Sequence, residues 1–115
     1  MQIDEYKTGS YMRVGGRSYH QDLKIINGEV HDSWWRDQGH RLKETDIEDV
    51  LQAKPHTLVI GTGYAGRMQI PRQTLSAIDE RDIRIIAEPT AKAVQTFNRL
   101  AESDLRVAGA FHLTC

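Results

Sequence analysis

The sequence predicts an α/β fold in which helices pack against a mixed β-sheet. From residue 45 onward, short apolar runs alternate with helical patterns, which gives two successive β-α-β units and hence parallel strands. The first 36 residues instead contain short β-prone runs punctuated by Gly15-Gly16 and Asn27-Gly28, two-residue signals typical of antiparallel hairpins. We therefore expect an N-terminal antiparallel β-meander followed by the order α-β-α-β-α-β.

Length and composition indicate one ordinary globular domain over residues 1–115. The chain has 115 residues, of which 39% are hydrophobic and 27% charged. Its formal net charge is −1, from 15 basic and 16 acidic residues, which argues against nucleic-acid binding. No apolar run approaches the roughly 18–20 residues that span a bilayer. The N-terminus lacks signal-peptide features and Cys115 is the only cysteine, so we expect a cytoplasmic protein without an intrachain disulfide.

The N-terminal part is predicted to contain three strands, at residues 11–14, 18–26 and 30–36. Neighbouring residues of a strand point to opposite faces, so Trp34 and Trp35 cannot share one core. We expect one tryptophan to pack inside. The other would lie on a second buried surface, a subunit contact or a site.

Three helices are predicted in the rest of the chain. Residues 45–48 read T-D-I-E, a capping box that places Thr45 at the start of the first helix, and Pro55 ends this helix. The second begins near Pro71 and is expected to bury Leu75 and Ile78. The third covers residues 90–103, and Asn98 within it is expected to bond an adjacent loop, a structural role.

The remaining strands are predicted from apolar, largely β-branched runs at residues 58–60, 83–88 and 106–113. The first of these strands runs into Gly61-Thr62-Gly63, where the backbone can turn sharply or approach another group closely. A strand, a glycine loop and then a helix is the layout of a ligand-binding crevice in an open α/β sheet.

Several segments match one family when their order and spacing are taken together. They are Trp35-Arg36, Gly39-His40, the L-V-I-G-T-G run of residues 58–63, Glu88, Thr90-Ala91, Phe97-Asn98, Leu100, Arg106-Val107 and Phe111-His112. Over residues 10–113 the chain resembles the small domain family that includes the mitochondrial complex I assembly factor 3 proteins and the adipogenesis-associated domain proteins. The resemblance implies a three-layer α/β fold with a mixed sheet and no established enzymatic activity. It also implies a relation to proteins associated with respiratory complex I assembly or cell differentiation.

A candidate binding pocket surrounds the glycine loop. Its residues are Gly61, Thr62, Gly63, Arg67, Glu88 and Thr90. The loop could hold a nucleotide, cradle a small anion or metabolite, or be a purely structural turn. The G-x-G-x-x-G pattern is present, but Pro71 delays the helix that a dinucleotide site requires directly after the glycines. Glu88 could act as an acid or base, or could with Thr90 simply favour the start of the next helix.

A candidate interaction surface consists of Trp34, Trp35, Arg36 and His40, because Trp and Arg are enriched at interface hot spots. His40 could line a site or be a surface or capping residue. No His or Cys spacing indicates a metal, and no cofactor or catalytic constellation is recognisable. We therefore expect a non-enzymatic, assembly-factor-like protein that binds another protein or a second copy of itself. The alternative is a small-molecule-binding or anion-binding protein, or an enzyme, with its site at the glycine loop.

Overall fold

The computed structural model describes residues 1–104 and 106–114, which form two β-sheets with three α-helices. Leu105 and Cys115, the cysteine singled out above, lie outside the described residues. The larger sheet has the strand order β5-β4-β8-β6-β7. Its strands are β4 (Leu23–Ile26), β5 (Glu29–His31), β6 (Thr57–Thr62), β7 (Arg84–Glu88) and β8 (Val107–His112). β5, β4 and β8 pair antiparallel, whereas β8, β6 and β7 pair parallel, so the predicted mixed sheet is confirmed.

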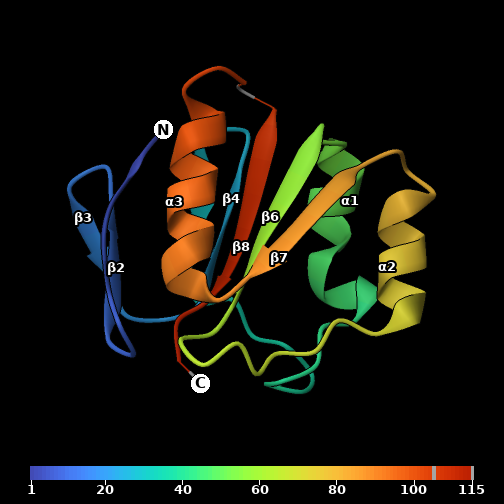
Figure 1. Cartoon of the computed structure of the whole chain (residues 1–115), viewed down its shortest axis with the longest axis horizontal. Coiled ribbons are helices and arrows are strands. Elements are labelled where there is room, and N and C mark those ends of the chain that lie inside the picture. The colour runs from blue at the N-terminus through green and yellow to red at the C-terminus, as the bar shows by residue number, and fades with distance from the viewer. Residues whose placement is uncertain (105, 115) are drawn as a thin grey trace.

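The fold has three layers (Figure 1). Helix α3 (Thr90–Ala101) and a small sheet cover one face of the large sheet, and α1 (Glu48–Ala53) and α2 (Arg72–Asp79) cover the other. The small sheet consists of β1 (Ile3–Lys7), β2 (Tyr11–Val14) and β3 (Arg17–Tyr19). It is held to α3 by the Asn98 side chain, which bonds the amide and the carbonyl of Ile3 at 2.8 and 2.9 Å.

The N-terminal meander is divided between the two sheets: one part forms a small separate layer and the other extends the large sheet. Residues 18–26 were expected to form one strand, but β3 ends at Tyr19 and the chain crosses to the large sheet before β4 begins at Leu23. The strand expected at residues 30–36 stops at His31, and the left-handed conformation of Ser33, with φ +53°, turns the chain away from the extended direction. Both two-residue hairpin turns are present as predicted, since Val14 pairs with Arg17 and Ile26 with Glu29.

Two details of the helices also differ from the prediction. Thr45 does not cap the first helix, since a 3₁₀ turn (Glu44–Ile47) precedes α1 and the Asp46 carboxylate accepts the Lys43 amide at 2.8 Å. In α2, Leu75 is 39% exposed, whereas Thr74, Ala77 and Ile78 are buried. The Thr74 hydroxyl donates to the Leu42 carbonyl at 2.8 Å, which fixes this face of α2 inward.

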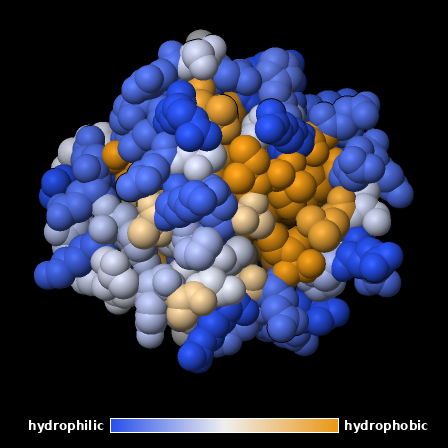
Figure 2. Space-filling model, viewed as in Figure 1, coloured by the Kyte–Doolittle hydropathy of each residue, from blue (hydrophilic) through white to orange (hydrophobic). Residues whose placement is uncertain are grey.

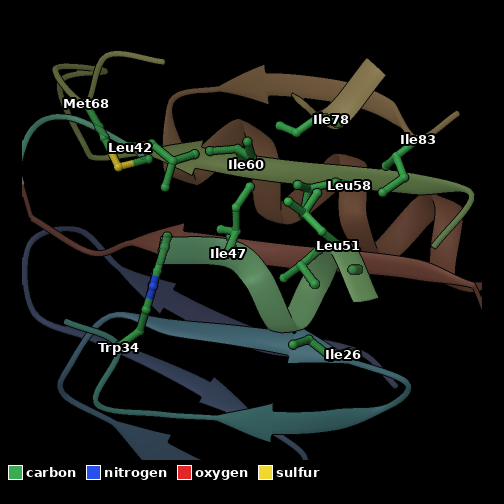
Figure 3. Close-up of a cluster of buried hydrophobic side chains, with 13 residues drawn as sticks. Ile26, Trp34, Leu42, Ile47, Leu51, Leu58, Ile60, Met68, Ile78 and Ile83 are labelled. Atoms are coloured by element: carbon green, nitrogen blue, oxygen red, sulfur yellow. The ribbon is translucent and has the colours of Figure 1, made fainter. Parts of the chain in front are cut away.

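Each face of the large sheet has its own core. On the α1 and α2 side, Leu58 and Ile60 pack with Ile47, Leu51 and Ile78, and Trp34 lies at one end of this cluster (Figure 3). On the α3 side, Phe97 and Phe111 meet edge to face with ring centroids 5.7 Å apart. A Cβ atom on Gly109 would overlap the Phe111 ring and lie 3.1 Å from Phe97 Cδ1. The central strand β8 therefore requires glycine at this position.

Candidate functional site

The candidate residues gather where β6, β7 and β8 end. Segment 32–43, loop 63–71 and the residues after β8 lie together below the large sheet in Figure 1. The carboxyl ends of parallel strands are the usual position of sites in open α/β sheets. The position of the predicted sites therefore agrees with the general rule, and the individual side chains decide what each site can do.

Thr90 holds the glycine loop through hydrogen bonds within the fold. Its hydroxyl accepts the Gly63 amide at 2.9 Å and donates to the His112 carbonyl at 2.6 Å, and its own amide donates to the Gly63 carbonyl at 3.0 Å. A Cβ on Gly61 would lie only 2.8 Å from Thr90 Oγ1 and 3.2 Å from Thr90 Cα. The close approach of α3 accounts for glycine at position 61, and the Gly63 amide is already paired.

The other pocket candidates point in different directions. The Thr62 hydroxyl donates to the Glu88 carbonyl at 3.1 Å, and the Glu88 carboxylate lies toward α3, accepting from Thr96 Oγ1 at 2.6 Å with Lys92 Nζ at 3.6 Å. Arg67 is exposed and lines a separate open depression together with Gln38, His40, Arg41, Gly66 and Gln69. The six residues proposed around the loop therefore do not face one common pocket.

A buried ionic cluster of Asp22, Arg36 and His112 lies beside the loop. Asp22 Oδ2 is 2.8 Å from Arg36 Nη2 and 2.7 Å from His112 Nδ1, and Asp22 Oδ1 accepts the Leu113 amide at 2.7 Å. The guanidinium also donates to the Gly39 carbonyl, at 3.2 Å from Nε and 2.8 Å from Nη2. The side chains of Arg36, His112 and Asp22 are only 3%, 5% and 16% exposed.

The hydrogen-bond geometry assigns the proton positions in the cluster. Arg36 Nη2 lies 2.9 Å from His112 Nδ1 as well, but its two hydrogens already have acceptors in the Gly39 carbonyl and Asp22 Oδ2. We therefore infer that His112 Nδ1 carries a hydrogen of its own and donates it to Asp22. Burial raises the pKa of Asp22. The hydrogen bonds from His112 and the Leu113 amide, with the attraction of His112 and Arg36, outweigh burial and hold this pKa below its reference value of 3.8.

Two polar atoms of the cluster have no hydrogen-bond partner among the described residues. They are Arg36 Nη1, a donor, and His112 Nε2, an acceptor when the ring is neutral, and both are buried. The residues that carry them, Arg36 and His112, line a cavity of about 250 Å³ together with Asp22, Trp34 and Trp35. Because buried polar groups normally have partners, these two atoms are the unusual feature of the cluster.

The two tryptophans have opposite environments. Trp34 is 6% exposed, donates from its indole Nε1 to the Asp46 carbonyl at 2.9 Å, and stacks under the Arg36 guanidinium at 4.6 Å. Trp35 is 74% exposed. Of the four residues proposed as an interaction surface, Trp34 and the Arg36 side chain are buried, whereas Trp35 and the adjacent His40 are exposed. The His40 ring lies edge to face with His112, with centroids 5.7 Å apart.

Asp22 and His112 were not among the site residues predicted from the sequence. Asp22 was placed inside a continuous strand, where nothing in the local pattern distinguishes it. His112 was noted only as part of the family resemblance, together with Phe111. A signal for His112 was its place at the carboxyl end of a predicted parallel strand, the position where polar site residues collect.

Within residues 1–104 and 106–114, no three His, Cys, Asp or Glu side chains are grouped so that they could hold a metal ion. The helices of the same residues include none that is long and apolar enough to cross a membrane.

Several solved structures share this fold. PH1505, a conserved hypothetical protein from Pyrococcus horikoshii OT3, is 22% identical with a TM-score of 0.84, and the alignment covers 100% of both chains. An outer membrane protein from Bartonella henselae is 25% identical with a TM-score of 0.81, and the match covers 98% of this chain and 94% of the other. A Bordetella pertussis protein described as a Mth938-like domain is 20% identical with a TM-score of 0.70, over 97% and 85% of the two chains.

The family can be assigned from the sequence match, independently of these structural similarities. The similarities below 25% identity show the fold alone, and the fold does not identify an activity. The family described as "Protein of unknown function (DUF498/DUF598)" matches residues 3–112, which is nearly the whole chain. The chain therefore belongs to the DUF498/DUF598 family.

Proposed function

We propose that this chain is a non-enzymatic binding protein that docks a protein partner through a surface centred on Trp35. The observation that carries the proposal is the 74% exposure of this large aromatic side chain. Tryptophan is the residue type most enriched among the side chains that dominate binding energy at interfaces. A tryptophan this exposed offers a partner a large apolar surface to bury.

The backbone on both sides of Trp35 is anchored, which favours binding further. Trp34 is fixed by its indole hydrogen bond to Asp46 and by the core, and the Trp34 amide donates to the Asp22 carbonyl at 2.8 Å. Arg36 is fixed by Asp22 and Gly39. Because its neighbours are already ordered, Trp35 loses little backbone freedom when it docks, and more of the contact energy appears as affinity. The assembly-factor role implied by the family resemblance agrees with such a surface.

The test is partner capture followed by an affinity measurement. Proteins retained from a native lysate by the immobilised chain are identified, the partner is purified, and its dissociation constant is measured for the native protein and for Trp35→Ala. We expect the variant to weaken binding by about 30-fold or more, which corresponds to the roughly 2 kcal/mol of a hot-spot residue. Leu75→Ala is the matched control, because Leu75 is an exposed apolar residue on α2 outside the proposed surface.

Unchanged binding by Trp35→Ala would refute the proposed surface, provided that both variants melt at the same temperature as the native protein. Equal losses in Trp35→Ala and Leu75→Ala would indicate non-specific apolar retention and would also count against it. Loss in Trp35→Ala alone supports the proposal.

A second candidate function, binding of a small anionic ligand, is favoured by the unpaired Arg36 Nη1 and His112 Nε2 atoms. This ligand would occupy the cavity beside Asp22, whereas the sequence analysis placed an anion at the glycine loop. Arg36 Nη1 would supply a charge-assisted hydrogen bond to a carboxylate or phosphate oxygen. The cavity of about 250 Å³ lies just below the range of pockets for drug-sized ligands, so it suits a small anion or metabolite.

Titration with inorganic phosphate and with acetate, followed by two-dimensional NMR, tests this second function. Saturable shifts of the Leu113 amide and the His112 ring are expected if the cavity is the site, and they should persist in Arg67→Ala. Shifts confined to residues 66–69 and abolished by Arg67→Ala would instead favour the open depression around Arg67. A ligand at 100 times its dissociation constant should also stabilise the fold by about 2.7 kcal/mol. Spectra that do not change would exclude these anions as ligands.

A further inference from the structure

Strand β7 is an unprotected edge of the large sheet. It stands at the end of the strand order and reads R-I-I-A-E, with Ile85 and Ile86 half-buried and Ala87 exposed. Figure 2 shows an apolar patch to the right of the centre, in the region where β7 lies in Figure 1, bordered by hydrophilic residues. Exposed apolar edge strands readily pair with another chain, and proteins usually block them with charges, proline or short length.

The other sheet edges carry such protection. β5 has only three residues and reads E-V-H, and β3 likewise reads R-S-Y. β1 reads I-D-E-Y-K, with charges in its centre and at its end. In β7 the charges are restricted to the two terminal residues, and the three central residues are apolar. β7 is therefore the edge whose side chains favour pairing.

The backbone of β7 has its free groups at the right positions for pairing. The Arg84 amide donates to the His56 carbonyl at 2.9 Å, toward β6. Because the peptide groups of successive strand residues point to opposite sides, Arg84, Ile86 and Glu88 bond β6, and Ile85 and Ala87 point their N–H and C=O groups away from the sheet. An added strand would bond at residues 85 and 87.

We propose that two copies of this chain associate by antiparallel pairing of β7 with β7 about a two-fold axis at Ile86. In this register Ile85 forms a hydrogen-bonded pair with Ala87 of the second copy, and the symmetry repeats this pair on the other side of the axis. Ile86 faces Ile86 of the second copy in the closer, non-hydrogen-bonded type of pair. The outward backbone groups of both copies are paired, and the two five-stranded sheets become one continuous sheet.

The same register places opposite charges against each other. Arg84 lies opposite Glu88 of the second copy on the face that also carries Ile86, and the symmetry generates the pair twice. Arg84 has no ion pair among the described residues. Glu88 Oε1 accepts from Thr96 Oγ1 at 2.6 Å, which leaves Oε2, with its long 3.6 Å contact to Lys92, to meet Arg84 of the second copy. Cross-strand pairs of opposite charge stabilise a sheet, whereas a parallel arrangement of the two edges would not create them.

The apolar contact occurs on both faces of the pair. Ile86 belongs to neither of the two core clusters of the described residues, so its exposed part is free to pack against its symmetry mate. Ile85 lies on the α2 side, where it packs against the core at the edge of the strand. Five residues from each chain make a smaller contact than the roughly 1,200–2,000 Å² of a standard interface, so the dimer should dissociate reversibly on dilution.

Sedimentation velocity between about 5 µM and about 1 mM measures this association directly. The native chain is expected to pass from monomer to dimer with rising concentration, and Ile86→Lys should weaken dimerisation at least about tenfold, because like charges would meet at the axis. Val30→Lys is the matched control: Val30 is a half-buried apolar residue on β5, the opposite edge, so its replacement should leave the dimer intact.

Charge reversal tests the register. Arg84→Glu places two carboxylates opposite each other and should weaken the dimer, and the double variant Arg84→Glu/Glu88→Arg should restore it. A merely structural role of either residue predicts no such rescue. Disulfide trapping gives an independent measurement in a Cys115→Ser background: Ile86→Cys should cross-link two chains under mild oxidation, and Ala87→Cys should not, because residue 87 does not face itself.

A native chain that stays monomeric up to the highest concentration would overturn the proposal. So would a dimer that Ile86→Lys and Ala87→Pro both leave unchanged, because proline at 87 removes an outward amide that the pairing requires. A dimer that is weakened by Arg84→Glu and not rescued by the double variant would overturn the antiparallel register. Concentration-dependent dimerisation with selective trapping through Ile86→Cys supports it.

Discussion

Replacing Thr90 by valine should strongly destabilise the fold, although the two side chains have nearly the same shape. Thr90 is fully buried, and its hydroxyl connects the end of β6 to the end of β8. It accepts from the Gly63 amide at 2.9 Å and donates to the His112 carbonyl at 2.6 Å. Valine leaves both backbone groups without that partner in a place where water has no access.

The expected magnitude follows from these two groups. A buried polar group left without a partner costs about 1–3 kcal/mol, so two groups cost about 2–5 kcal/mol after the small gain from the added methyl group. Thr90→Ser keeps the hydroxyl and loses one methyl group, which should cost only about 1 kcal/mol. A typical domain has roughly 5–15 kcal/mol of stability, so the valine variant should lose a large fraction of its total.

Urea denaturation followed by circular dichroism gives the free energies of unfolding of the three proteins. The expected order is native, then Thr90→Ser, then Thr90→Val, with unchanged dependence on urea concentration. A valine variant within about 0.5 kcal/mol of the native protein would refute the reasoning, since the hydroxyl would then not bridge the two strands. A serine variant as unstable as the valine variant would show that the methyl group, and not the hydrogen bonds, is what matters.

Three further predictions follow from the same structure. The lowered pKa of Asp22 means that folding favours its ionised form. Its contribution to stability is therefore full above about pH 4 and is lost as the pH falls through its folded-state pKa. Asp22→Asn should flatten the acid limb of a profile of unfolding free energy measured from about pH 7 to about pH 2. Gly109→Ala should cost about 1–3 kcal/mol by overpacking, read as a lower melting temperature, whereas Gly39→Ala, where the added Cβ meets no atom within 4 Å, should not change it. Trp35→Phe keeps only the buried indole of Trp34, so its tryptophan fluorescence should lie at shorter wavelength and resist acrylamide quenching. Trp34→Phe should show the opposite. Indistinguishable fluorescence spectra would contradict the opposite environments of the two side chains.

The parts of the fold predicted correctly are those encoded by local patterns. The Gly15-Gly16 and Asn27-Gly28 hairpins have positive φ at all four residues, as two-residue turns of this type require. The apolar run of β6 is buried on both faces, which is why its residues do not alternate. Helix α3 follows the predicted stripe, with Ala93 and Phe97 buried. Each of these features depends on residues close together in the chain.

The division of the meander between two sheets does not have such a local signal. β1 lies at a sheet edge and carries charged residues at positions 4, 5 and 7. These charges hide the alternation of apolar and polar residues that would mark a strand in the sequence. The exposure of Leu75 has a similar origin. The hydrogen bond from Thr74 to Leu42 turns the helix so that a polar residue faces inward, and that bond joins residues 32 positions apart. Propensity and periodicity describe a helix alone, whereas its rotation is set by what it packs against.

The ionic cluster at the site shows the same limit most clearly. Asp22 and His112 are 90 residues apart, and they meet because β4 and β8 pair antiparallel with Leu23 opposite Phe111. In that register the residue before Leu23 necessarily faces the residue after Phe111, so the contact follows from the pairing and not from either segment. A shift of the pairing by one residue would move every β4 side chain to the opposite face of the sheet. Leu23 and Ile25 would then leave the core on the α3 side. The apolar pattern that fixes the register therefore also brings Asp22 and His112 together. The glycine loop is recognisable in the sequence because its glycines are adjacent in the chain, yet its hydrogen bonds are made within the fold. The unpaired polar atoms lie in the cluster that only the strand register brings together.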